Sequence, residues 1–293
     1  MLLSRARLVV VTGKGGVGRS TTAAAIARLE RSRGRRVLAV DASPSVGLGL
    51  ALGNPLPPGE MVAIDTDLSA LRLTPEAALD EYVKMTLRAP VSPRSLGPVA
   101  RIFDFVATAA PAVREILTIG KIGHEVRRGP WDTVVVDGPA TGHIVELLDA
   151  PAALGELVGI GPLAAESAWL TELLHDDEQT EVVVVTTPEE LPVNETLELV
   201  ARLGQRTSVT VSTIVVNRMV AALGDAARDE ERRLADTDSP VATLARVAVA
   251  RAERAIEEAG RLAALELPII TVPEDDDPVA ASAEVLATHW RAT

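Results

Sequence analysis

The chain has 293 residues, 47% of them hydrophobic, and a formal net charge of −12 at pH 7. An acidic surface disfavours sequence-independent DNA binding, which depends on lysine and arginine neutralising phosphates, and it disfavours a basic membrane anchor. The absence of cysteine excludes disulfides, thiolate zinc sites and cysteine nucleophiles.

The first predicted strand, residues 8–12, leads directly into a glycine-rich loop. An Ala-rich helical segment over 22–32 follows, which gives the strand, loop and helix order of a P-loop. The glycines let successive backbone N–H groups turn toward an anion, and the helix presents its positive N-terminal end to the same place. The residues expected to bind nucleotide phosphates are Gly13, Gly15, Gly16, Val17, Gly18, Arg19, Ser20 and Thr21.

Two side chains of this segment bear on the expected chemistry. Ser20 stands where the P-loop pattern places the hydroxyl that ligates Mg²⁺. The lysine of the pattern is replaced by Arg19, whose planar guanidinium is larger than an ammonium group. Two interpretations follow: the loop holds a nucleotide through an altered phosphate contact, or Arg19 partly fills the pocket.

The run Gly-Lys-Gly-Gly-Val-Gly at 13–18 contains an additional lysine, Lys14. This run resembles the deviant P-loop of the family that includes the arsenical-pump ATPases, the tail-anchored-protein targeting ATPases, and the MinD and ParA positioning ATPases. The resemblance implies ATP and Mg²⁺ as cofactors, and a dimer in which Lys14 reaches the partner's nucleotide. The alternative for Lys14 is a solvated loop charge.

The second predicted strand, 36–40, ends at Asp41, and Ser43 and Pro44 follow. By resemblance this is switch I. Alignment on Pro44 places Ser43 where the family has the aspartate that positions the attacking water, and Asp41 is the first acid of the D-x-D pattern. A serine can orient water but carries no charge to polarise it. We therefore predict catalytic positions at Lys14, Asp41 and Ser43, with weak or absent hydrolysis.

The segment after switch I is predicted to be mostly helical. Short strands are expected at 61–64 and 71–73, and a helical subdomain over about 74–128. Residues 74–82 resemble a segment of the arsenical and targeting branch of the family; their sequence is Thr-Pro-Glu-Ala-Ala-Leu-Asp-Glu-Tyr. Apolar residues of this subdomain are expected to form core, with a client groove as the alternative.

The third predicted buried strand, 131–137, ends at Asp137. An aspartate at this end of a strand beside a P-loop typically holds Mg²⁺ through a water. The continuation 138–143 resembles the switch II of the same branch, which gives His143 a switch role. A short helical stretch over about 144–175 lacks the Met-rich client-binding insert of the eukaryotic targeting factors.

The last third of the chain repeats the strand and helix alternation. Strands are predicted at 181–186, 209–217 and 267–272, with long helices between them and a final helix at 278–291. By resemblance, Asn217 reads the adenine ring and Pro273 lies near the base. A neutral loop residue is the alternative for Asn217.

Together these features predict a single α/β domain over 1–293, a doubly wound parallel sheet of the P-loop NTPase class. The helical subdomain would be inserted between the switch I and switch II strands. The resemblance implies an ArsA-like ATPase that binds Mg-ATP at a dimer interface and couples nucleotide state to the handling of a partner or client.

The first alternative is a non-hydrolysing subunit that pairs, as a heterodimer, with a catalytically intact relative. A MinD- or ParA-like positioning ATPase is a third hypothesis, disfavoured by the acidity and by the lack of a basic terminal helix. No apolar run approaches the length of a membrane span, and the first strand leaves no room for a signal peptide. We therefore expect a cytoplasmic protein without nucleic-acid partners or a direct membrane anchor.

Overall fold

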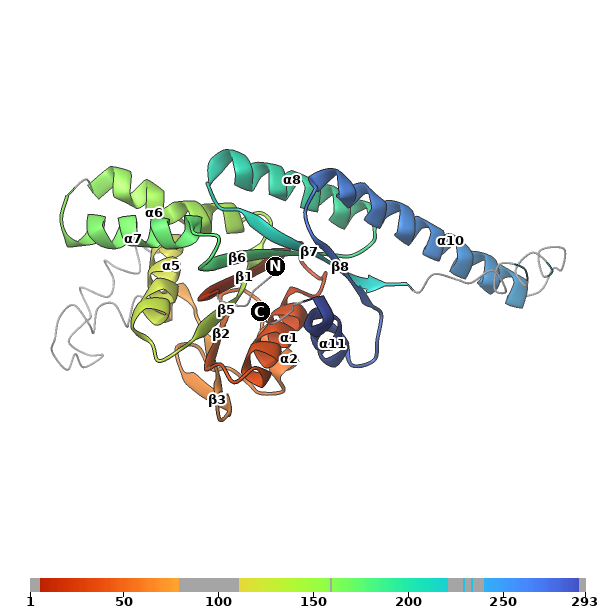
Figure 1. Ribbon diagram of the computed structural model, residues 1–293, viewed down its shortest axis with the longest axis horizontal. Helices are drawn as coiled ribbons and strands as arrows, with labels where there is room; N and C mark the ends of the chain where they lie inside the picture. The colour runs from red at the N-terminus through yellow and green to blue at the C-terminus, as the bar shows by residue number, and fades with distance from the viewer. Residues whose placement is uncertain are drawn as a thin grey trace.

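The computed structural model describes residues 6–78, 111–158, 160–220, 229, 233 and 240–289. They form an α/β fold with strand order β3-β4-β2-β5-β1-β6-β7-β8 in a single sheet (Figure 1). The strands are β1 (Leu8–Gly13), β2 (Val37–Asp41), β3 (Met61–Asp65), β4 (Leu68–Arg72), β5 (Thr133–Ala140), β6 (Thr180–Thr186), β7 (Val211–Met219) and β8 (Ile269–Pro273). The helices are α1 (Arg19–Ser32), α2 (Gly47–Leu52), α5 (Pro111–Arg128), α6 (Ile144–Val158), α7 (Pro162–His175), α8 (Glu190–Arg206), α10 (Pro240–Arg261), the 3₁₀ turn η1 (Leu262–Leu265) and α11 (Pro278–His289).

The centre of the sheet consists of valine-rich strands that are buried on both faces. β1 lies between β5 and β6 and pairs with both in parallel. Near-continuous apolar runs are typical of parallel strands that helices cover on both sides. The predicted doubly wound fold is confirmed, with the addition that the edge strand β3 runs antiparallel to β4.

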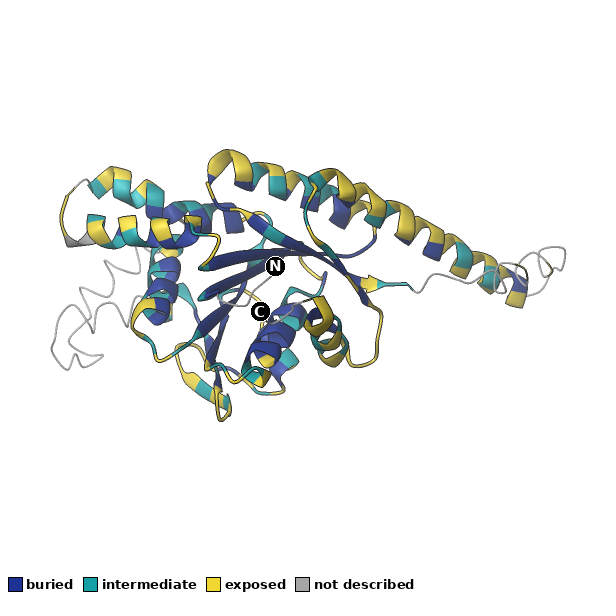
Figure 2. Cartoon of the chain, viewed as in Figure 1, coloured by how far each residue is buried: buried dark blue, intermediate teal, exposed yellow. Residues whose placement is uncertain are grey.

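Helices form a layer on each face of the sheet. Figure 1 shows α1, α2 and α11 on one face, and α5, α6, α7, α8 and α10 on the other. Each layer encloses its own hydrophobic cluster, one around Ala25 and Ile26 of α1 and one around Ile122, Ile144 and Leu199. The burial colours of Figure 2 place the core along the sheet, whereas α10 extends from it with a largely exposed surface.

The register of the central strands determines what meets at their carboxyl ends. Asp41, the last residue of β2, is paired directly with Asp137 of β5. The P-loop follows β1, which is the other neighbour of β5. The parallel pairing therefore brings the predicted loop, switch I and switch II to one edge of the sheet.

Some predicted elements differ in detail from the structure. The helix α2 was not predicted, and β4 begins at Leu68, before the strand expected at 71–73. The helical stretch at 144–175 is two helices, because Gly161 has a φ of 114° and Pro162 begins a new helix. Most of the predicted subdomain at 74–128 lies outside the described residues. Within the described ranges, no helix is both long and apolar enough to cross a membrane.

Candidate nucleotide site

The P-loop requires glycine at two positions for reasons of space as well as backbone conformation. Gly13 has a φ of 147°, and a Cβ there would overlap the carbonyl oxygen of Val185 on β6. Gly18 has a φ of 99°, and a Cβ there would overlap the side-chain amide of Asn217. The loop is thus packed tightly against β6 and β7, while Gly15 and Gly16 at its tip are exposed.

Asn217 is hydrogen-bonded to the P-loop. Its buried side chain lies near the end of β7, and Nδ2 donates a hydrogen bond to the carbonyl of Val17 at 2.8 Å. The other predicted base-proximal residue, Pro273, ends β8 and pairs in register with Met219 at the end of β7. Both predicted residues therefore lie at the same edge of the sheet as the loop.

Ser20 and Asp137 form the polar centre of the site. Ser20 lies in the first turn of α1, and its hydroxyl donates a hydrogen bond of 2.5 Å to Asp137 Oδ2. Asp137 is fully buried, and its Oδ1 has no hydrogen-bond partner. Burial raises the pKa of Asp137 to about 6; the nearby Asp41 raises it too, while the Ser20 hydrogen bond and Arg19 oppose the shift. A buried oxygen without a donor is suited to receive a cation or a water.

Arg19 is held toward switch II. Its guanidinium donates a hydrogen bond of 2.5 Å to the carbonyl of Gly138, the residue after Asp137. Burial lowers the pKa of Arg19, and the carboxylates of Asp137 and Asp41 oppose that effect. The Arg19 guanidinium, which replaces the P-loop lysine, therefore lies close to both aspartates. One of its N–H groups is already used in the hydrogen bond to the Gly138 carbonyl. Thr21, the last predicted phosphate-binding residue, is half-buried in the same turn of α1.

Switch I is organised around Asp41. Ser43 donates to Asp41 Oδ1 from its hydroxyl at 2.9 Å and from its backbone N–H at 3.2 Å. The Ser43 hydroxyl also lies 2.9 Å from that of Ser45. Asp41 Oδ2 is buried without a partner, and burial raises the pKa of Asp41 against the hydrogen bonds from Ser43.

Lys14 is paired within its own chain. Its ammonium lies 2.6 Å from Oε1 of Glu195, a residue near the start of α8. Thr141 of switch II donates to the other carboxylate oxygen, Oε2, at 3.3 Å. The sequence motifs did not single out Glu195.

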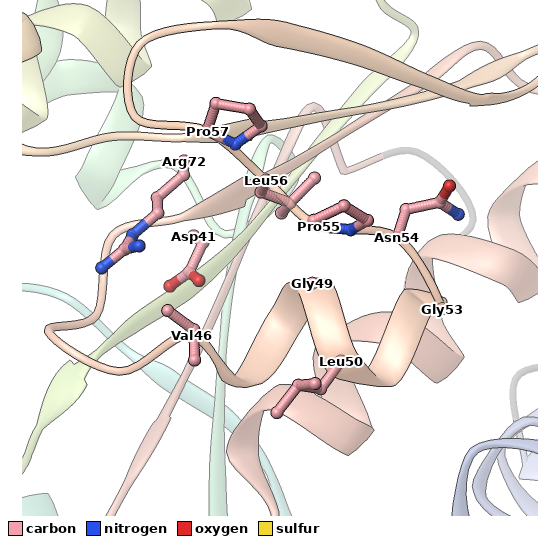
Figure 3. A pocket seen from close by; sticks show the side chains of 10 residues that line it. All are labelled: Asp41, Val46, Gly49, Leu50, Gly53, Asn54, Pro55, Leu56, Pro57 and Arg72. Atoms are coloured by element: carbon pink, nitrogen blue, oxygen red, sulfur yellow. The ribbon is translucent and has the colours of Figure 1, made fainter.

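Two cavities adjoin switch I. A cavity of about 650 Å³ lies between α2, the proline-containing turn after it and the end of β4, with Asp41 and Arg72 among the side chains that line it (Figure 3). A second, of about 340 Å³, contacts switch I, α5 and switch II, including His143. Arg72 lines both cavities, and its Nε is buried without a partner. Arg72 belongs to no motif, so the sequence did not indicate that it lines these cavities.

Comparison of the sequence with known proteins finds a family model and several ATPases that are similar to this chain. The family model described as anion-transporting ATPase matches residues 6–165 and 163–236. The ATPase BagA of Mycobacterium tuberculosis is 36% identical over 231 residues, which are 75% of this chain and 67% of that protein. The ATPase GET3B of Arabidopsis thaliana is 24% identical, over 74% of this chain and 65% of that protein. The arsenical pump-driving ATPase of Escherichia coli is 28% identical, over 80% of this chain and 36% of that protein.

The family match covers most of the chain and includes β1, the P-loop, switch I and switch II. The resemblance that the sequence motifs indicated is therefore confirmed. This chain belongs to the anion-transporting ATPase family.

Proposed function

We propose that this protein binds Mg-ATP at the P-loop and couples the nucleotide state to a conformational change, with slow hydrolysis by the isolated chain. The observation that carries the proposal is the hydrogen bond between the half-buried Ser20 and the buried Asp137 beside the glycine loop, with one carboxylate oxygen of Asp137 left without a partner. A dimer with nucleotide at its interface, formed with a second copy or a related ATPase, is part of the proposal through the family resemblance.

The residues present fit a magnesium ion. The Ser20 hydroxyl and the Asp137 carboxylate are hard oxygen donors, and Mg²⁺ is usually held by one or two such groups, with water and phosphate oxygens completing the shell. Among the described residues no group of three or more histidine and acidic side chains lies close enough together to form a metal cluster. When bound, Mg²⁺ would neutralise charge on the phosphate oxygens.

The remaining steps are assigned to groups of this chain. Amides of the loop and the N-terminus of α1 bind the phosphates, and Arg19 supplies positive charge near them. Ser43 orients the attacking water with Asp41 beside it, and Lys14, from the partner subunit by family resemblance, stabilises the charge of the transition state. Hydrolysis is expected to be slow because Ser43 is neutral and its hydroxyl donates to Asp41, while Arg19 is hydrogen-bonded to Gly138.

A non-hydrolysing subunit is the second candidate. The same two substitutions, Arg19 and Ser43, support it, because each replaces a group that the family uses in the reaction. In this version the chain still binds nucleotide and offers Lys14 to a related, intact partner. The Escherichia coli relative is an arsenical pump-driving ATPase. A cysteine-ligated arsenic site is excluded for this chain, because it contains no cysteine.

Calorimetry of ATP and ADP binding with Mg²⁺, together with ATP turnover, tests the proposal. Both are measured on the wild type, on Lys14→Ala and on the double variant Arg19→Lys/Ser43→Asp. Slow turnover by the wild type that Lys14→Ala abolishes supports the ATPase. Binding without turnover, with turnover gained in the double variant, supports the non-hydrolysing subunit. A wild type and a double variant that both fail to bind nucleotide would reject both versions.

A further inference from the structure

A closed set of contacts joins the P-loop, switch II and α8. Lys14 binds one oxygen of the Glu195 carboxylate at 2.6 Å, and the Thr141 hydroxyl binds the other at 3.3 Å. The backbone N–H of Thr141 in turn donates to the carbonyl of Gly13, the residue before Lys14, at 3.3 Å. One carboxylate therefore connects the two segments that flank the proposed phosphate site.

Glu195 is suited to this position because its helix is anchored independently. The adjacent Asn194 accepts a hydrogen bond of 2.6 Å from Arg261 at the end of α10. Val193 and Thr196, which flank Asn194 and Glu195 in the sequence, are buried. The Lys14 and Glu195 side chains keep only 26% and 30% of their surface exposed, so the pair is less screened than a fully solvated ion pair.

We propose that Glu195 is the positioning residue for Lys14 and holds its ammonium away from phosphate until nucleotide competes for it. This inference rests on the proposed nucleotide site. The Glu195 carboxylate, 2.6 Å away, occupies one of the three N–H donors of the ammonium and offsets much of its positive charge. A phosphate on the same chain or on a dimer partner therefore competes with this carboxylate for Lys14. Binding of a triphosphate therefore exchanges one anion for another around Lys14.

The exchange would also reach switch II. When Lys14 leaves, the Glu195 carboxylate loses its cationic partner and keeps the hydrogen bond from the neutral Thr141 hydroxyl. The hydrogen bond from switch II then carries a larger share of the stabilisation of this charge. Glu195 thereby links occupation of the loop to the segment that begins at Asp137.

The experiment compares Glu195→Gln with Glu198→Gln, an equal charge change at an exposed position of the same helix. Affinity for a non-hydrolysable ATP analogue is measured by calorimetry at constant ionic strength, in the wild-type and Lys14→Ala backgrounds. Removal of the competing carboxylate is expected to tighten binding about two- to fivefold, the range for a partly exposed ion pair. Glu198→Gln should leave the affinity unchanged, and Glu195→Gln should have no effect once Lys14 is alanine.

Two results would overturn the proposal: unchanged or weaker binding in Glu195→Gln, or the same tightening in the Lys14→Ala background. A purely structural role for Glu195 gives one of these, because loss of packing does not depend on Lys14. Equal tightening by Glu198→Gln would also overturn it, since only the net charge would then matter.

A second measurement separates this inference from the proposed function. A double-mutant cycle of urea unfolding for Lys14→Ala and Glu195→Gln, in the absence of nucleotide, tests the pair itself. Non-additive effects on the unfolding midpoint are expected for side chains in contact. A protein that binds no nucleotide but shows this coupling would reject the proposed function and retain the contact, whereas additive effects would reject the inference directly.

Discussion

Asp137 occupies a position in which its charge is poorly compensated when the site holds no metal. It is fully buried, one oxygen is without a partner, and the neighbouring acid Asp41 is paired with it in register across two strands. Arg19 and Ser20 only partly offset the loss of hydration. A cation bound at this position would offset the buried charge.

The stability of the metal-free protein is expected to depend on pH through this residue. Because the folded pKa of about 6 lies above the unfolded value of about 4, the folded state binds the proton more tightly. The contribution of Asp137 to stability is therefore fully present below pH 4 and is lost as the pH rises through 6. The total change is about 2–3 kcal/mol.

Urea unfolding in EDTA at several pH values, for the wild type and Asp137→Asn, measures this contribution. The difference between the two proteins should grow in favour of Asp137→Asn between pH 5 and pH 7.5. Added Mg²⁺ should stabilise the wild type more at pH 7.5 than at pH 5. A pH-independent difference would show that the Asp137 carboxyl titrates normally.

Gly18 offers a test of the loop geometry. Gly18→Ala places a methyl group against the Asn217 amide at a φ that L residues rarely adopt, so a loss of about 1–3 kcal/mol in the free energy of unfolding is expected. Gly15→Ala is the matched control for stability, because nothing lies within 4 Å of its added Cβ. Equal stability of the two variants in chemical denaturation would contradict the described packing.

At the scale of elements, α1 is fixed at its end by a buried acid. Glu30 is only 1% exposed, and its two oxygens accept hydrogen bonds from Arg33 and Arg35. Arg35 also donates to the backbone carbonyls of Ala6 and Asp132, which precede β1 and β5. This cluster ties the helix that begins at the P-loop to the opposite end of the central strands.

Arg35→Ala is expected to cost about 2–4 kcal/mol, since it removes the donor to a buried carboxylate oxygen of Glu30 and to the carbonyl of Asp132, whereas the carbonyl of Ala6 keeps the hydrogen bond from the Thr133 hydroxyl. Arg31→Ala is the control: its pair with Asp65 is exposed, and a loss below about 1 kcal/mol is expected. Thermal and urea unfolding of both variants give the comparison. Similar losses for the two would mean that the Glu30 cluster is no stronger than a surface ion pair.

The sequence predicted most of the central elements because their signals are local. Apolar runs identify β1, β2, β5 and β6, and an acid or a glycine marks where β2 or β1 ends. The partner of Lys14 could not be predicted in this way, because Glu195 lies 181 residues further along the chain. The antiparallel course of β3 was also missed, since a five-residue alternation does not specify the direction of pairing.

At the scale of the whole molecule, the fold brings the predicted site residues to one edge of the sheet, and family resemblance predicts that a second chain completes the site. Light scattering with a non-hydrolysable ATP analogue and Mg²⁺ tests this for the isolated chain. The expected result is a doubling of mass that Lys14→Ala weakens. A chain that stays monomeric when saturated with nucleotide would instead favour a heterodimer with a related ATPase.

The position of β1 within the sheet has a consequence for how the protein is made. β1 leaves the ribosome well before its two neighbours in the sheet, which begin at Thr133 and Thr180. Until those segments are synthesised, one of the most apolar stretches of the chain lacks both of its partners in the sheet. Such non-local pairing is typical of slow folding and exposes nascent chains to aggregation. Efficient production of this protein should therefore depend on shielding its N-terminal strand during translation.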